Sequence, residues 1–245
     1  MLRVAALAVV LFAGQAIAVA ETVLVAGASG GTGRLLVERL LADGLTVRGL
    51  TRDPDEARER TGLDIEWVAG DVRDPVSLAR VFAGVEYVQC AVGAREPFGA
   101  NRPEMVDYKG VTHLVDAAKA AGSVKRFVLL SSANVTIVGH PFNAGFNNLL
   151  IWKYLGEDHL RRSGLEYAIV RPPQLLDEAG GIAGIRLQQG DPGGPGQMPR
   201  ADLADVMIEA MTSPHTRNAT FEIFRDTDLP PGGWRDRLTD LTPDS

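Results

Sequence analysis

A glycine-rich turn near the start of the chain constrains the fold more than any other feature. The segment from Gly27 to Gly33, which reads G-A-S-G-G-T-G, follows an apolar run, Thr22 to Ala26, and precedes an amphipathic stretch. Strand, turn and helix therefore come in the order that a dinucleotide phosphate site requires. The alternative is an ordinary strand-to-helix turn. The predicted phosphate-binding residues are Gly27, Ser29, Gly30, Gly31, Thr32 and Gly33.

Composition limits the kind of partner that the chain can have. The 245 residues are 45% hydrophobic and 23% charged, which fits one globular domain with a sizeable core. The net charge is -6 and the sequence contains no run of lysine or arginine, so nucleic acid is excluded as a partner and a small molecule is favoured. Cys90 is the only cysteine, so neither an intrachain disulfide nor a cysteine zinc site is expected.

The first twenty residues have the pattern of a targeting segment. Arg3 precedes an uncharged, alanine-rich run from Val4 to Ala20, and the run ends in the small-x-small motif Ala18-Val19-Ala20. We predict that residues 1–20 are a secretory signal peptide, with a retained membrane anchor or a mis-assigned start as alternatives. The chain would then be exported or membrane-tethered, and cytoplasmic only if the start is mis-assigned. Residues 21–245 form the predicted NAD(P)-binding domain.

The remainder alternates strands and helices, which predicts an α/β fold with a doubly wound parallel sheet in a single domain. The second strand, Leu45 to Thr51, ends at Arg52 and Asp53, where the adenine ribose of a bound dinucleotide lies. An arginine there pairs with the 2′-phosphate of NADP, and a carboxylate binds the ribose hydroxyls of NAD. Arg52 favours NADP, while Asp53 keeps NAD open.

Later strand ends supply further candidate residues. Asp71 and Val72 follow the third strand, where Asp71 either accepts from the adenine amino group or stabilises a turn. Ala91-Val92-Gly93 follows the strand that contains Cys90, and these small residues permit close approach of a cofactor. Ser131 and Ser132 end a nearly continuous apolar strand, and Ser131 is the better candidate for orienting a substrate or a proton.

Four segments together resemble the short-chain dehydrogenase/reductase superfamily, in particular its atypical members such as flavin reductase/biliverdin reductase B and NmrA-like proteins. They are Val25–Arg34, Gly70–Val72, Val124–Ser132 and Ser163–Pro173, and the resemblance extends over nearly all of Glu21 to Leu238. It implies a Rossmann fold with the phosphates on the glycine turn and Arg52 near a 2′-phosphate. It also implies Lys153 on the nicotinamide ribose and Pro172 beside the nicotinamide.

The chain departs from typical members of that superfamily at the catalytic tyrosine, which lies four residues before the lysine. Here that position is Leu149, and Tyr154 faces another way on a helix. Proton donation to a ketone is therefore in doubt, whereas a flavin or quinone takes hydride onto a ring and protons from water. We predict an NAD(P)H-dependent oxidoreductase that acts on a small planar acceptor, with Ser131 and Lys153 as catalytic residues.

Two other functions stay open. A non-catalytic redox sensor or scaffold would bind the dinucleotide and present its surface to a protein partner. A nucleotide-sugar epimerase or dehydratase would need the missing tyrosine and a larger C-terminal region. The glycine-rich segment Gly190–Gly196 is predicted to be a loop near the substrate opening, either a lid or a plain connector. His113, His140, His159 and His215 are scattered along the chain, so we predict no metal site.

Overall fold

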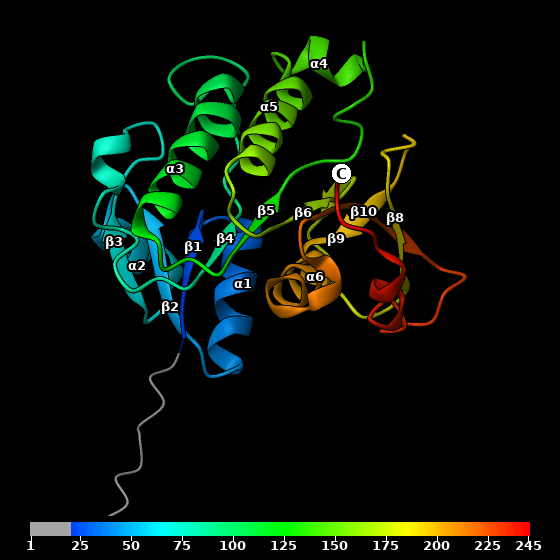
Figure 1. Cartoon of the computed structure of the whole chain (residues 1–245), viewed down its shortest axis with the longest axis horizontal. Helices are drawn as coiled ribbons and strands as arrows, with labels where there is room; N and C mark the ends of the chain where they lie inside the picture. The colour runs from blue at the N-terminus through cyan, green and yellow to red at the C-terminus, as the bar shows by residue number, and fades with distance from the viewer. Residues whose placement is uncertain (1–20) are drawn as a thin grey trace, which may run out of the picture.

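A computed structural model describes residues 21–245 (Figure 1). The predicted signal peptide or anchor at residues 1–20 lies outside the described residues and stays a prediction. Between residues 21 and 245, no helix combines the length and apolar character that a membrane span needs.

An eight-stranded sheet forms the centre of the molecule, in the order β3-β2-β1-β4-β5-β6-β10-β8. All neighbouring strands are parallel except β8, which pairs antiparallel with β10 at one edge. The order 3-2-1-4-5-6 is that of a Rossmann sheet, so the predicted fold class is confirmed. The strands are β1 (Thr22–Ala26), β2 (Thr46–Thr51), β3 (Glu66–Ala69), β4 (Tyr87–Cys90), β5 (Arg126–Leu130), β6 (Tyr167–Arg171), β8 (Gly184–Gln188) and β10 (Ala219–Asp226).

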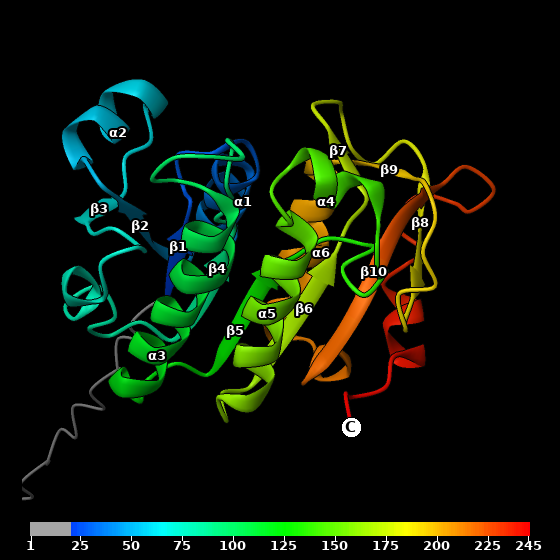
Figure 2. The same ribbon diagram turned by 90° about the horizontal axis from the view of Figure 1, so that it is seen from above.

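Helices cover both faces of this sheet, as Figures 1 and 2 show. Alternate residues of β1 explain the two layers, because Val23 and Val25 pack in one apolar cluster while Leu24 and Ala26 pack in the other. Helices α1 and α6 lie on the first face, and α3 and α5 lie on the second. The helices are α1 (Gly31–Ala42), α2 (Pro54–Thr61), α3 (Val111–Ala121), α4 (Pro141–Gly145), α5 (Leu149–Arg162) and α6 (Arg200–Thr212).

Three helices differ from what the sequence pattern predicts. The pattern predicts one helix over 105–121, but this segment starts as a π-helix, η2 (Glu104–Gly110), and becomes α-helical only in α3. It predicts a helix over about 75–82, where the structure has a single 3₁₀ turn, η1 (Pro75–Leu78), capped by the Asp74 carboxylate. It also predicts that Lys153 opens a helix, but α5 begins at Leu149 and places the lysine in its second turn.

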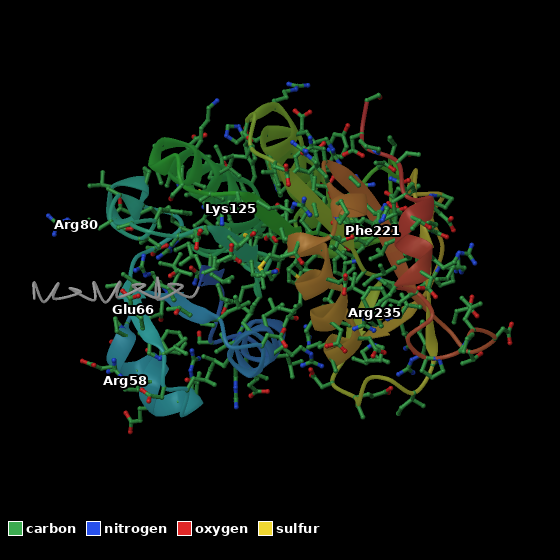
Figure 3. All side chains as sticks on the ribbon, turned by 60° about the horizontal axis from the view of Figure 1, so that its bottom comes forward. Arg58, Glu66, Arg80, Lys125, Phe221 and Arg235 are labelled. Atoms are coloured by element: carbon green, nitrogen blue, oxygen red, sulfur yellow. The ribbon has the colours of Figure 1, made fainter. Side chains whose placement is uncertain are left out.

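The C-terminal part contributes strands to the same sheet and a short parallel pair, β7 (Gln174–Leu176) with β9 (Gln197–Pro199). Figure 3 shows Phe221 of β10 in the crowded interior near α6, where its side chain is fully buried. The loop Gly190–Gly196 is fixed at one end, because the buried Asp191 carboxylate accepts hydrogen bonds from the backbone of Asn134 and Thr136 at 2.7 and 2.9 Å.

A buried ionic network lies where β6 and β10 meet α5. The Arg171 guanidinium donates to Glu157 of α5 at 2.6 and 2.9 Å and to Glu222 of β10 at 3.0 Å. Both carboxylates are 0% exposed, and Arg171 is 4% exposed. Since Glu157 follows Lys153 by one helical turn and Arg171 directly precedes Pro172, this network fixes the backbone beneath two predicted site residues.

Candidate functional site

The glycine turn joins β1 to α1 in the geometry of a phosphate cradle. Gly27 has a positive φ of 88°, and the N–H of Gly30 donates to the Gly27 carbonyl at 2.9 Å. A Cβ atom on Gly33 would lie 2.0 Å from that carbonyl oxygen, so only glycine lets α1 approach the turn. No side chain within residues 21–245 caps the start of α1, which leaves its first N–H groups for an anion.

This turn opens into a cleft of about 1030 Å³ along the carboxyl ends of the strands. Ligands of open α/β sheets bind at that edge. Gly33 is buried beneath the turn, and the structure brings all the other predicted site residues together around the cleft. They are Gly27, Ser29, Gly30, Gly31, Thr32, Arg52, Asp71, Val72, Ala91, Val92, Gly93, Ser131, Lys153 and Pro172.

Arg52 and Asp53, the two residues considered for binding the adenine ribose, have different surroundings in the structure. The Asp53 carboxylate caps α2 by accepting from the N–H groups of Asp55 and Glu56 at 3.1 and 3.0 Å. Arg52 is exposed, lines the cleft, and has a weak contact with the Asn101 amide oxygen at 3.5 Å. One oxygen of the Asp53 carboxylate, Oδ1, is therefore engaged by α2 although Asp53 also lines the cleft, whereas the Arg52 guanidinium has only its weak contact with Asn101.

Asp71 is held by a neighbour that the sequence did not indicate. Its carboxylate accepts from the backbone and the guanidinium of Arg73, with Nε 3.0 Å from Oδ1. Hydrogen bonds from Arg73 hold the pKa of Asp71 below its usual range, against the effect of burial. The carboxylate is therefore ionised and engaged in a local turn, which is the second of the two roles considered for it.

Ser131 and Lys153, the two predicted catalytic residues, both line the cleft. Ser131 is 5% exposed, and its buried hydroxyl oxygen has no hydrogen-bond partner among the described residues. Lys153 forms an ion pair with Asp107 of η2, with 2.8 Å between Nζ and Oδ1. An unpartnered buried hydroxyl that faces a cleft is expected to bind a ligand, because leaving it unpaired costs free energy.

Among the described residues, no tyrosine or histidine lines this cleft, although several carboxylates and Lys153 do. None of the four tyrosines, Tyr87, Tyr108, Tyr154 and Tyr167, lines it within the described part of the chain. Tyr154 is 40% exposed and packs against Arg161 on the outer side of α5. The four histidines do not line it either, and no metal-binding cluster occurs in residues 21–245. Cys90 is buried, which raises its thiol pKa to about 12.

Fold and cleft define a dinucleotide-binding Rossmann protein. Residues 27–214 match the model of a family described as NAD(P)H-binding, and the chain belongs to that family. It is 34% identical over 213 residues to an uncharacterized chloroplastic protein of Arabidopsis thaliana, covering 78% of this chain and 65% of that protein's length. It is 30% identical over 242 residues to the sanguinarine reductase of Eschscholzia californica, covering 82% of this chain and 88% of the relative.

Solved structures agree with this assignment. A Bacillus halodurans protein described as an NAD-dependent epimerase/dehydratase has a TM-score of 0.78 and 27% identity, covering 90% of this chain and all of that one. An anaerobilin reductase of Escherichia coli O157:H7 has a TM-score of 0.71 and 26% identity, covering 86% of this chain and all of that one. The predicted resemblance to the short-chain dehydrogenase/reductase superfamily is thereby confirmed.

The residues around the cleft fit a nicotinamide dinucleotide. The crowding around Gly33 and Gly27 leaves backbone, without side chains, facing the diphosphate position. Ser29 and Thr32 lie on this turn, and Ala91, Val92 and Gly93 form a wall of small side chains along the cleft. Arg95 and Arg200 also line the cleft, although no sequence motif marks either arginine.

Proposed function

We propose that the protein is an NADPH-preferring reductase that transfers hydride to a small planar acceptor of the flavin or quinone kind. The observation that carries this proposal is the combination, in one cleft, of a dinucleotide cradle with a nicotinamide end that offers Ser131 and Lys153 but no tyrosine or histidine. Relatives named as reductases support the general kind of reaction. An epimerase is not favoured, because no tyrosine lines the cleft among residues 21–245.

The acceptor end of the cleft supports the planar class. Phe146 and Leu175 line it beside Pro172 and Pro173, and Phe146 stacks on Phe142 with 5.6 Å between ring centroids. An aromatic wall of this kind favours a flat ring system over a flexible polar substrate. The segment around α4 that carries both phenylalanines lies at the end of α5, as Figure 1 shows.

The residues would divide the work as follows. A bound nicotinamide supplies hydride from its C4 atom. The N–H groups of the glycine turn hold the diphosphate, Lys153 holds the nicotinamide ribose, and Pro172 limits the ring's position. Ser131 donates a hydrogen bond to an oxygen or nitrogen of the acceptor, and the reduced ring then takes its proton from water at the open mouth of the cleft.

Turnover with the full chain tests this function. We expect NADPH to be consumed with a flavin or a soluble quinone, as followed by the absorbance of the reduced nicotinamide. Replacing Ser131 with alanine should lower kcat/KM for the acceptor roughly tenfold, since one hydrogen bond of about 1–1.5 kcal/mol is lost, with NADPH affinity unchanged. Binding of NADPH without turnover of any such acceptor would favour the non-catalytic sensor instead.

Arg52 carries the predicted preference for NADPH. Replacing it with alanine should weaken NADPH binding by roughly tenfold to a hundredfold, the worth of a charge-assisted contact, and leave NADH within about twofold. Arg58 provides a matched control, because it lies on the neighbouring helix α2, pairs with Asp55 at the periphery of the molecule (Figure 3) and does not line the cleft. Fluorescence titration measures both affinities, and equal losses for NADPH and NADH would contradict the role.

A further inference from the structure

The ion pair behind Lys153 suggests how the lysine is held without a tyrosine. Asp107 is 1% exposed, and its carboxylate makes two contacts. Oδ1 lies 2.8 Å from Lys153 Nζ, and Oδ2 accepts from the Ala94 N–H at 3.0 Å. Ala94 directly follows Gly93 in the wall of the cleft. One carboxylate therefore connects the lysine on α5 to the loop after β4.

Local packing holds this carboxylate in place. Asp107 lies in the π-helix η2, and π-helical turns are frequent at functional sites. Gly156 lets α5 approach η2 closely, because a Cβ atom there would lie 2.6 Å from the Asp107 carbonyl oxygen. Beside the ion pair, Tyr108 stacks on Trp152 with ring centroids 5.9 Å apart. Two successive residue pairs thus join η2 to α5, which restricts the carboxylate and the ammonium group.

Gly93 forms the cleft wall beside the ion pair of Asp107 and Lys153. A Cβ atom on Gly93 would lie 3.6 Å from Asp107 Oδ1 and 4.0 Å from Lys153 Nζ. The glycine therefore leaves the ammonium group accessible from the cleft, where the Lys153 side chain retains 14% exposure. The contact with Asp107 is an ion pair by distance, since Oδ1 has no hydrogen-bond partner among the described residues, so the ammonium group keeps N–H donors for a ligand.

We propose that Asp107 is a positioning residue, which holds Lys153 so that its N–H donors face the nicotinamide ribose. This inference rests on the proposed dinucleotide site. In this proposal the buried carboxylate of Asp107 orients Lys153, which has no tyrosine partner in the cleft. Because Asp107 also fixes Ala94, the lysine and the cleft wall share one support.

A comparison of two ligands distinguishes a positioning role of Asp107 from a merely structural role. NADPH includes the nicotinamide ribose, whereas adenosine 2′,5′-bisphosphate fills only the adenine half. We expect Asp107→Asn in the full chain to weaken NADPH roughly tenfold, the worth of a charge-assisted contact, and to leave the bisphosphate within about twofold. Equal weakening of both ligands, or no change in NADPH, would overturn the proposal.

The matched control is Asp116→Asn. Asp116 is also a carboxylate that joins this helical layer to α5, through His159 at 2.7 Å, but it is largely exposed and does not line the cleft. It should change neither affinity. If the unmodified chain fails to bind NADPH, the proposed function fails, whereas a failure confined to the Asp107→Asn comparison removes only the positioning role.

A second variant keeps the test independent of folding, because Asp107→Asn leaves a buried ammonium group without its counterion. Asp107→Asn combined with Lys153→Gln replaces both charges by amides of similar size. If Asp107 acts through Lys153, the double variant binds NADPH as tightly as Lys153→Gln alone. A further loss of about tenfold in the double variant would show that Asp107 acts independently of the lysine, against the proposal.

Discussion

Replacing Gly30 with valine is expected to abolish NADPH binding while the protein remains folded. Gly30 precedes α1 with extended backbone angles, φ −87° and ψ 171°, that any residue can adopt. A Cβ atom there would lie 3.2 Å from the Gly27 carbonyl oxygen and 3.6 Å from Arg95 Nη2. Small shifts absorb these contacts, but the branched side chain would occupy the space over the N–H groups that receive the diphosphate. Fluorescence titration should show a loss of at least about a hundredfold.

Gly145 provides the control for that substitution. It lies at the end of α4, and a Cβ atom there would meet nothing within 4 Å. Gly145→Val should therefore leave NADPH affinity unchanged. Far-ultraviolet circular dichroism should be the same for both variants. Retained NADPH affinity in a folded Gly30→Val protein would remove the diphosphate from this turn.

Replacing Arg171 with methionine should lower the free energy of unfolding by about 3–5 kcal/mol, the range for breaking a buried ion pair on one side. The substitution leaves Glu222 without its only cationic partner in the network and removes one of two from Glu157. Denaturant unfolding of the full chain measures this loss. Arg162→Met is the matched control, because Arg162 pairs with Asp158 on the surface of α5 and should contribute less than about 1 kcal/mol.

The same variant has an expected pH dependence. Burial raises the pKa of Glu222, so its folded state favours the protonated form more than the unfolded chain does. Because the pKa of Glu222 is higher in the folded protein than in the unfolded chain, the free energy of unfolding falls as pH rises through the folded-state pKa. Removing Arg171 makes this fall in the free energy of unfolding larger. The destabilisation should therefore shrink as pH falls from about 7 toward about 5. A loss that stays constant over this range would show that the missing packing, not the unpaired carboxylate, is responsible.

Most of the fold follows from local patterns in the sequence. The glycine turn, the apolar strands and the helix after Pro199 appear where they were expected. Helix α2 was not predicted, although Asp53, Pro54 and Gly62 carry its start and stop signals, because only Ala57 of this helix is buried and its sequence lacks an apolar period. The π-helical turn η2 was not predictable, since no local motif marks it and its close contact with Gly156 joins segments far apart in the sequence.

The residues of the candidate site that could be predicted are those of the glycine turn and those at the ends of strands. Gly27, Gly30, Gly31, Arg52 and Ser131 line the cleft, and Gly33 lies buried beneath the turn. Pairs that form between distant segments were not predictable. Asp107 meets Lys153 across 46 residues, and nothing in the sequence around it marks it as more than a helical carboxylate. Arg73 was missed for a different reason, because arginine in a turn is usually solvated.

The use of the Asp53 carboxylate as a helix cap has a consequence for protein engineering. In the proposed function, cofactor preference and helix stability rest on adjacent residues, with Arg52 at the cleft and one Asp53 oxygen engaged by the N–H groups of α2. Position 52 can therefore be varied in a library without loss of the cap. Changes at position 53 would remove the cap, so a redesign of cofactor preference should retain the aspartate and randomise its predecessor.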